Sequence, residues 1–393
     1  MKMPKTNHIL NLPEFRLLKT IGFSPLTFKV QYIGKPSCPQ CSSSKLRLKA
    51  KRHRLIKHEP IGGRMTYLKL FSRKYHCLDC NRYFYQPLPG VGRYQRATER
   101  LKQHASKLHR NGISQKCLAK ELSIGSATIE RWYHHCYQKE DAKASNRHCP
   151  RVLGIDEHFF GKGKRFATTL CDLKKHRVFD LLPGRNKNDI KHELESLKGR
   201  MSVQVVCMDL SQHYRHIVKE FFPNAAIVAD RFHVIRLINH AFMEAYKRFD
   251  PNIKSNRGML AALRKNPNKL TPKQATKCKD IFRQHEAIQT LYNFKQRLHH
   301  LLMHKTKNKQ QCKGLAITFL RMIEQLRQSP LPPLKKLAKT LKSWKEEIAR
   351  MWRFTKSNGI TEGFHRKMKL IQRNAYGFRN FENYRLRVRV LCG

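Results

Sequence analysis

The chain has 393 residues, enough for about two or three domains and for a sizeable core that needs no disulfides. Lys and Arg number 81 against 27 Asp and Glu, and the formal net charge of +54 predicts a polyanionic partner such as DNA. Because the sequence has neither an apolar run of about 18 residues nor a signal-peptide pattern, we expect no membrane contact and a cytoplasmic, nucleoid-associated protein.

Four cysteines near the N-terminus are spaced as metal ligands. They form two C-x-x-C pairs, Cys38 with Cys41 and Cys77 with Cys80. Each pair can hold one edge of a tetrahedral Zn²⁺ ion, so we expect structural zinc within an N-terminal segment of residues 1–95. The strand-like run RMTYLKLFSRKYHC predicts a small β module inserted between the pairs. Unrelated free thiols are a weaker interpretation, and so is a thioredoxin-like redox pair, since neither pair opens a helix after a strand.

Residues 96–140 have a helix-turn-helix pattern centred on GISQKCLAKELSIGSATIERWYHHC. Ser114 can cap a first helix, Gly125 lies in the turn, and Ser126 can cap a second helix. The residues of that second helix that would face a DNA major groove are Ser126, Thr128, Glu130 and Arg131. Helix pairs are common in proteins, and the zinc module beside this pair strengthens the prediction of a DNA-binding domain. The polar residues 141–150, which end in proline, predict a linker.

Residues 151–237 alternate strand-like and helical runs. Three strands (VLGID, FATTLCDL and HRVFDLLPGR) are followed by a helix, the strand VQVVCMD, a helix, the strand AAIVAD and a helix. This order predicts an α/β core with a mixed sheet, and it matches the ribonuclease-H-like fold.

Residues 238–355 are helical and rich in Lys and Arg, and they are too many for a loop. They predict an all-helical insertion into the α/β core, in which Thr271 before a proline marks a helix start. An apolar stripe from Leu334 to Trp352 should be the core of this insertion rather than a DNA wedge. Residues 356–393 should complete the catalytic core with a last helix and a basic tail.

Acids are scarce in this chain, and two of them follow apolar strands. Asp156 ends VLGI and Asp209 ends VQVVCM, two strands that are neighbours in a ribonuclease-H-like sheet. Each could merely cap a helix, although Ser211 can cap the helix after Asp209. With Glu362 at the start of the last helix, these carboxylates would hold two Mg²⁺ or Mn²⁺ ions for phosphodiester chemistry.

Asp230 and His233 lie at the next strand end, in the run DRFH. His233 could donate to the scissile phosphate or orient a catalytic carboxylate. The residues alone leave open the alternative of a core histidine whose hydrogen bonds are satisfied.

Together the motifs resemble the ISL3 (ISL-three) family of bacterial insertion-sequence transposases. The likeness rests on GIDE, MDLS, FPNAAIVADRFHVIR and SNGITEGFHRKMKLIQRNAYGFRNFENYRLR, and it spans nearly the whole chain. It implies a DDE transposase with a ribonuclease-H-like catalytic domain interrupted by helices. By this resemblance Asp156, Asp209 and Glu362 are the catalytic acids, and Asp230 with His233 matches the D-x-x-H signature of related enzymes, which favours a functional His233.

The resemblance also implies contacts between a basic C-terminal pattern and transposon-end DNA. The residues concerned are Lys369, Arg373 and Tyr376. We therefore expect an enzyme that binds terminal inverted repeats and target duplex, acts as a homo-oligomer on DNA, and cleaves and joins strands. Two rivals stay open: a zinc-finger and helix-turn-helix regulator without catalysis, and a ribonuclease-H-like nuclease or resolvase without strand transfer.

Overall fold

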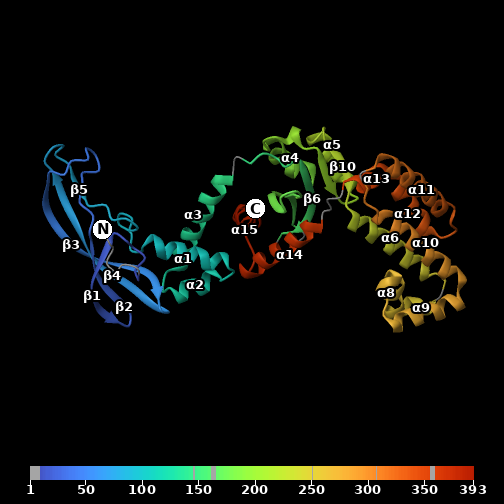
Figure 1. The fold of residues 1–393 in the computed structure, drawn as a ribbon, viewed down its shortest axis with the longest axis horizontal. Coiled ribbons are helices and arrows are strands. Elements are labelled where there is room, and N and C mark those ends of the chain that lie inside the picture. Colours follow the sequence, from blue (N-terminus) through green and yellow to red (C-terminus); the bar gives the residue numbers. More distant parts are fainter. Residues whose placement is uncertain (1–8, 145–146, 161–164, 250, 307, 355–358) are drawn as a thin grey trace. The chain divides into compact units, whose positions relative to one another are not determined.

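The computed structural model describes residues 9–144, 147–160, 165–249, 251–306, 308–354 and 359–393 (Figure 1). The chain divides into two compact units, Met1–Glu140 and Asp141–Gly393. Within the described ranges, no helix combines the length and apolarity that crossing a lipid bilayer requires.

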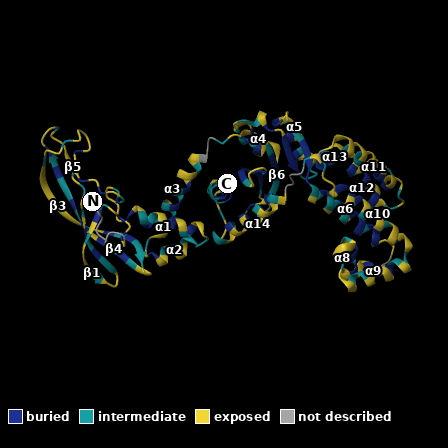
Figure 2. Ribbon diagram, in the orientation of Figure 1, coloured by how far each residue is buried: buried dark blue, intermediate teal, exposed yellow. Residues whose placement is uncertain are grey.

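Unit 1 begins with a five-stranded sheet of order β1-β2-β4-β3, with β5 paired to β4. Its strands are β1 (Phe15–Phe23), β2 (Leu26–Tyr32), β3 (Leu46–Ile61), β4 (Arg64–Cys77) and β5 (Tyr83–Tyr85). The long β3–β4 hairpin turns at Gly62 and Gly63, whose φ angles of 59° and 72° favour glycine. Phe15, Val30 and Leu68 lie in the core of this sheet, while much of β3 is exposed (Figure 2).

Three helices complete unit 1: α1 (Glu99–Arg110), α2 (Gln115–Glu121) and α3 (Ser126–Ala144). Ser114 caps α2 as expected, since its hydroxyl accepts from the Cys117 amide at 3.2 Å. Ser126 is the first residue of α3 rather than its cap, so this expectation was wrong by one position. α3 also continues to Ala144, into the stretch that we expected to be a linker.

Unit 2 contains a five-stranded sheet of order β10-β9-β6-β7-β8. Its strands are β6 (Val152–Phe159), β7 (Phe166–Asp172), β8 (Arg177–Pro183), β9 (Val205–Met208) and β10 (Ala226–Ala229). β6, β9 and β10 are parallel neighbours, whereas β7 is antiparallel to both β6 and β8. The helices between these strands are α4 (Lys187–Ser196) and α5 (Gln212–Phe221), with a short 3-10 helix, η2, at Arg200–Ser202. The mixed α/β core predicted from the sequence is therefore present.

A helical region follows β10 (Figure 1). Its helices are α6 (Arg231–Tyr246), α7 (Pro251–Ser255), α8 (Arg257–Arg264), α9 (Pro272–Gln284), α10 (Glu286–Met303), α11 (Lys309–Gln328), α12 (Pro332–Ser343) and α13 (Lys345–Arg353), with the 3-10 helix η3 at Pro267–Lys269. α6 runs across the boundary expected between residues 237 and 238. The apolar stripe is core, as predicted, although it is divided between α12 and α13 at Trp344.

Two helices follow the insertion, α14 (Gly359–Asn374) and α15 (Phe381–Cys392). The expected basic tail is thus itself helical, and α14 is not the last helix. α15 packs against β8, and its Tyr384 and Val388 are fully buried. Its Arg385 donates to both carboxylate oxygens of Asp180 on β8, at 2.9 and 2.8 Å, and to Glu193 on α4 at 2.7 Å. Buried ion pairs thus join α15 to the sheet.

Arg385→Met should destabilise unit 2 by about 3 kcal/mol, because it removes both short hydrogen bonds to the buried carboxylate of Asp180 and leaves it only the more distant Arg389, at 3.7 Å. Arg327→Met is the matched control: it breaks an ion pair with Glu324 whose side chains are 62% and 43% exposed, and should change stability by less than about 1 kcal/mol. Urea denaturation followed by tryptophan fluorescence measures both. Equal effects of the two variants would contradict a structural role for the buried pair.

Candidate active site and zinc centre

The four cysteines of unit 1 come together at one end of the β3–β4 hairpin. Their sulfur atoms all lie within 4.8 Å of one another. Sγ of Cys38 is 3.5 Å from Sγ of Cys80, and Sγ of Cys41 is 3.5 Å from Sγ of Cys77. Four thiolates about 2.3 Å from a central ion have this spacing, so the group fits tetrahedral Zn²⁺. The β insertion expected between the two pairs is the hairpin itself.

The two C-x-x-C turns have the same local geometry. The residue after the second cysteine of each turn, Ser42 or Asn81, has a positive φ of 58° or 56°. The amide of Cys41 hydrogen-bonds the Cys38 sulfur and lowers the pKa of this thiol to about 6. The amide of Cys80 likewise lowers the pKa of Cys77. The first cysteine of each turn therefore favours the thiolate form that a metal requires, whereas desolvation raises the pKa of Cys80 to about 12.

In unit 2 the two aspartates expected from the sequence meet at one sheet edge. β6 pairs with β9 in parallel, up to Ile155 opposite Met208. Asp156 and Asp209 are the next residues of the two segments and are therefore adjacent across the sheet. Asp209 is not a helix cap, because the Ser211 hydroxyl occupies this role and accepts from the Tyr214 amide at 3.4 Å.

The positions of Asp156 and Asp209 disfavour the charged form of both carboxylates. Burial raises the pKa of Asp156 to about 6, and the nearby carboxylates of Asp209 and Asp230 add to the rise. Burial also raises the pKa of Asp209. Buried like charges at one edge need a cation, and oxygen ligands suit Mg²⁺ or Mn²⁺, so the donor set fits a divalent ion.

Asp230 and His233 adjoin this pair. Asp230 follows β10, and its amide donates to the Met208 carbonyl at 2.6 Å. His233 donates from Nδ1 to Oδ2 of Asp230 at 2.8 Å, because a carboxylate can only accept. This hydrogen bond, with the charges of Asp156 and Asp209, raises the pKa of His233. His233 is thus oriented by Asp230 and faces the carboxylate edge.

Glu362 lies on the first turn of α14, and the structure does not bring it into contact with the two aspartates. Its side chain is 52% exposed and pairs with Arg366 at 3.1 Å. Among the described residues, the four cysteines are the one group of three or more potential ligands within 4.8 Å, and the carboxylates do not form a second. α14 nevertheless reaches the edge, since Nδ1 of His365 is 3.8 Å from Oδ2 of Asp156.

His365 and its neighbours were not singled out from the sequence. Nε2 of His365 is 3.1 Å from the Thr169 hydroxyl, which is 3.0 Å from Nδ1 of His158. Nε2 of His158 is in turn 3.0 Å from the Tyr384 hydroxyl on α15. This buried chain connects α15 to Asp156 through β6, β7 and α14. The available signal was the three-residue spacing of His365 from Glu362, which places both on adjoining parts of a helix surface.

The expected DNA-contacting residues of α3 lie at its start. Ser126 and Arg131 are exposed, and Thr128 and Glu130 are half-buried. Arg131 donates to the Thr128 hydroxyl at 3.1 Å. The opposite side of α3 packs inward through buried Ile129. This arrangement leaves the polar residues available to a ligand.

The expected basic contacts near the C-terminus are also on the surface. Lys369 and Arg373, on α14, are exposed. Tyr376, just after α14, is 86% exposed and has a φ of 52°. In the described structure, the side chains of Arg373 and Tyr376 can contact a DNA backbone without breaking a hydrogen bond.

Comparisons with known proteins match most of the chain. A family profile described as "Transposase" matches residues 153–388. Two others, "zinc-finger of transposase IS204/IS1001/IS1096/IS1165" and "Helix-turn-helix domain of transposase family ISL3", match residues 34–80 and 86–137.

Curated relatives agree with these profiles. The chain is 26% identical over 370 residues to the transposase for insertion sequence element IS1001 of Bordetella parapertussis, which covers 90% of this chain and 88% of the relative. It is 25% identical over 260 residues to the transposase for insertion sequence element IS1557 of Mycobacterium tuberculosis (strain ATCC 25618 / H37Rv), which covers 58% of this chain and 57% of the relative.

Cys77→Ser should lower the zinc content from about one ion per chain to near zero and loosen the β3–β4 hairpin, because a site with three thiolates holds zinc much less tightly. The control is Cys117→Ser, which changes an exposed cysteine outside the cluster and should keep the zinc. Metal analysis of the purified proteins measures the difference. Full zinc retention by Cys77→Ser would show that these cysteines are ordinary thiols.

Asp156→Asn should stabilise unit 2 at neutral pH, by on the order of 2 kcal/mol. The folded pKa of about 6 exceeds the ordinary value of 3.8, so ionisation destabilises the fold as pH rises between these values. The asparagine oxygen can still accept from the Glu157 amide, as Asp156 does at 2.9 Å.

Thermal denaturation at pH 7.5 and pH 5, without chelator so that zinc is retained, measures this effect. The gain should shrink at pH 5, and added Mg²⁺ should stabilise only the wild type at pH 7.5. Asp280→Asn, at an exposed position, is the control and should change stability by less than about 0.5 kcal/mol. A less stable Asp156→Asn at pH 7.5 would mean that a protein cation already satisfies Asp156.

Proposed function

The chain belongs to the ISL3 family of transposases, and on this premise we propose that Asp156, Asp209 and Glu362 are its catalytic metal-binding carboxylates. The enzyme is a DDE transposase that cleaves DNA and transfers strands in a metal-dependent reaction. The observation that carries the assignment is the parallel pairing of β6 with β9, which makes Asp156 and Asp209 neighbours.

We further propose a ribonuclease-H-like fold for the catalytic domain. The support is the strand order β8-β7-β6-β9-β10 with β7 as the antiparallel strand, and helices after β8, β9 and β10. In this reading residues 151–237 and 356–393 form the catalytic domain, and residues 238–355 form its insertion. Residues 1–95 and 96–140 are the zinc-binding and helix-turn-helix parts, and the linker expected over 141–150 begins within the last turn of α3, which ends at Ala144.

The proposed role of the acids is to hold two Mg²⁺ or Mn²⁺ ions beside the scissile phosphate. When bound, such ions stabilise negative charge on the attacking and leaving oxygens of the phosphodiester. Asp156 and Asp209 supply ligands from the sheet edge. Glu362 supplies the third from α14, by exchanging its exposed ion pair with Arg366 for a metal ligand. Asp230 holds His233, whose raised pKa favours a protonated donor toward the phosphate.

DNA recognition is proposed for α3 and for the surface after α14. Ser126, Thr128 and Arg131 would read or contact the terminal inverted repeat in the major groove. Lys369 and Arg373, with Tyr376 as a supporting contact, would bind the backbone near the cleavage site. Two transposon ends must be brought together, so we propose a homo-oligomer on DNA, acting at the bacterial nucleoid with terminal repeats and target duplex as partners.

Two rival functions make different demands on these residues. A regulator built from the zinc and helix-turn-helix parts would need none of the acids. A nuclease or resolvase with the same core would need the acids and would not join strands. Neither explains as much of the chain as a transposase, because the transposase profile covers residues 153–388.

Asp209→Asn should lower cleavage and strand transfer by at least about 1,000-fold, equivalent to about 4 kcal/mol of lost barrier lowering, while binding to terminal-repeat DNA stays unchanged. Asp230→Asn is the neighbouring control and should cost only about 10- to 100-fold, as for a residue that orients a ligand or donor. A substrate cut beforehand, with a free 3′-hydroxyl, tests joining directly. Activity retained by Asp209→Asn would refute the assignment, and cleavage without joining would favour a nuclease.

A further inference from the structure

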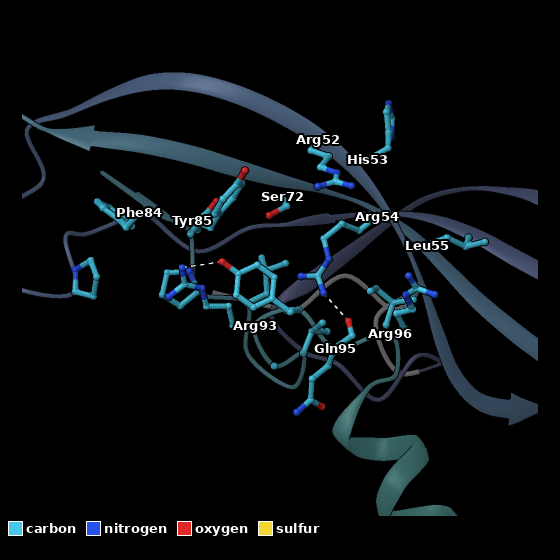
Figure 3. A pocket seen from close by; sticks show the side chains of 18 of the residues that line it. Arg52, His53, Arg54, Leu55, Ser72, Phe84, Tyr85, Arg93, Gln95 and Arg96 are labelled. Carbon is cyan, nitrogen blue, oxygen red and sulfur yellow. Dashed lines mark hydrogen bonds between the residues drawn. The ribbon is translucent and has the colours of Figure 1, made fainter. Parts of the chain in front are cut away.

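Unit 1 contains a basic and aromatic cavity that the proposed function does not use. The cavity, of about 870 Å³, lies between β3, β5 and the loop of residues 87–96 (Figure 3). Its volume is in the range of about 300–1,000 Å³ that is typical of ligand pockets. It lies outside the four-cysteine cluster and outside α3, although Pro39 of the first cysteine turn contributes to its wall. We call it the arginine cavity.

The charge of the arginine cavity is unbalanced. Five arginines line it, namely Arg52, Arg54, Arg82, Arg93 and Arg96. None of the described lining residues is an Asp or Glu. Burial and the neighbouring charge of Arg52 lower the pKa of Arg54, which indicates that these positive charges are not neutralised by the protein. Unneutralised positive charge of this kind favours an anionic ligand.

Aromatic rings accompany the arginines. Tyr83 and Tyr85 on β5 are 53% and 37% exposed, and Tyr94 in the loop is 74% exposed. The guanidinium of Arg93 lies over the Tyr94 ring, 4.8 Å from its centroid, and donates to its hydroxyl at 2.8 Å. Exposed rings beside phosphate-binding cations are the arrangement that stacks unpaired bases while the backbone is neutralised.

The loop that carries Tyr94 is held in place on both sides. Leu88 and Val91 are buried in the core of the sheet. The Lys57 amide donates to the Arg96 carbonyl at 2.9 Å, and Arg54 donates to the Gln95 carbonyl at 2.5 Å (Figure 3). Within this fixed loop, Tyr94 has a φ of 61°. This left-handed conformation belongs to a tight turn in which the Gln95 amide donates to the Gly92 carbonyl at 3.1 Å, and the turn leaves the Tyr94 ring exposed at the cavity.

We propose that the arginine cavity binds single-stranded DNA, by stacking one or more unpaired bases on its tyrosines and binding the adjacent phosphates through its arginines. The shape favours a single strand over a duplex, because a hollow of this size admits a nucleotide, whereas a duplex would contact only its rim. Unpaired nucleotides are present at a cut or melted transposon end. The proposal rests on the proposed function in one respect, that the polyanion is DNA.

The test uses the full-length, zinc-loaded chain and a labelled single strand of about 20 nucleotides without self-complementarity, compared with the same sequence as a duplex, by fluorescence anisotropy. Tyr94→Ala should weaken single-strand binding by about 5- to 100-fold and leave duplex binding within about 2-fold. Tyr94→Phe should retain wild-type affinity, because it keeps the ring. Arg52→Gln, which changes a lining arginine that does not hold the loop, should also weaken single-strand binding and lower the salt dependence by about one phosphate contact.

Phe23→Ala is the matched control, since Phe23 is a 70% exposed aromatic residue on β1 outside the cavity. It should bind both probes like the wild type. Unchanged single-strand binding by Tyr94→Ala would overturn the proposal, and so would an equal loss for both probes, which would indicate a duplex-binding surface. Asp209→Asn, assayed in parallel, should bind the single strand normally. Its loss of cleavage therefore tests the catalytic assignment independently of the cavity.

Discussion

The parallel pairing of β6 with β9 is the constraint on which the catalytic region depends. β9 is buried over its whole length and so are Leu153 to Ile155 of β6, so the register of the pair is fixed by the hydrophobic core. A slip of one residue would turn apolar side chains to the wrong face of the sheet. The free energy of burying those side chains therefore holds Asp156 beside Asp209, in a position that raises the pKa of both carboxylates. The hydrophobic core thus maintains a carboxylate pair that is unfavourable without a cation. The core residues themselves take no direct part in the catalytic chemistry.

The sheet edge that carries Asp156, Asp209 and Asp230 also fixes the position of the helical insertion. α6 begins directly after Asp230, and α13 returns to pack against β10 (Figure 1). Arginine side chains join the two parts through backbone carbonyls: Arg350 donates to Ile227 at 3.1 Å and Arg231 to Met351 at 2.8 Å. Because guanidinium groups stay charged and offer several donors, they can satisfy strand and helix carbonyls where an ordinary side chain could not. Some of the positive charge of this chain thus has a structural role.

Much of this architecture could be predicted from the sequence because it depends on local patterns. The apolar runs VLGI, VQVVCM and AAIVA are each followed by an acid, and this pattern located Asp156, Asp209 and Asp230, although β6 continues beyond Asp156 to Phe159. α15 was missed because arginines interrupt its apolar face, and one of them, Arg385, is itself buried against Asp180. The surroundings of Glu362 could not be predicted either, since they depend on how α14 meets β6. The contact of His365 with Asp156 joins residues more than two hundred positions apart.

The arginine cavity could not be predicted from the sequence either. Its walls also connect it to the four-cysteine cluster. The cavity is formed by residues from β3, β5 and a loop, and no single stretch of sequence contains its pattern. The cysteine turns close the end of β3 and β4, where Leu46 pairs with Cys77, and β5 begins soon after Cys80. Arg82, which lines the cavity, donates to Gln40 of the first cysteine turn at 2.5 Å. A zinc ion held by the four cysteines would therefore support one wall of the cavity through the first cysteine turn and Arg82, and it would favour DNA binding by holding β5 in place without contacting DNA.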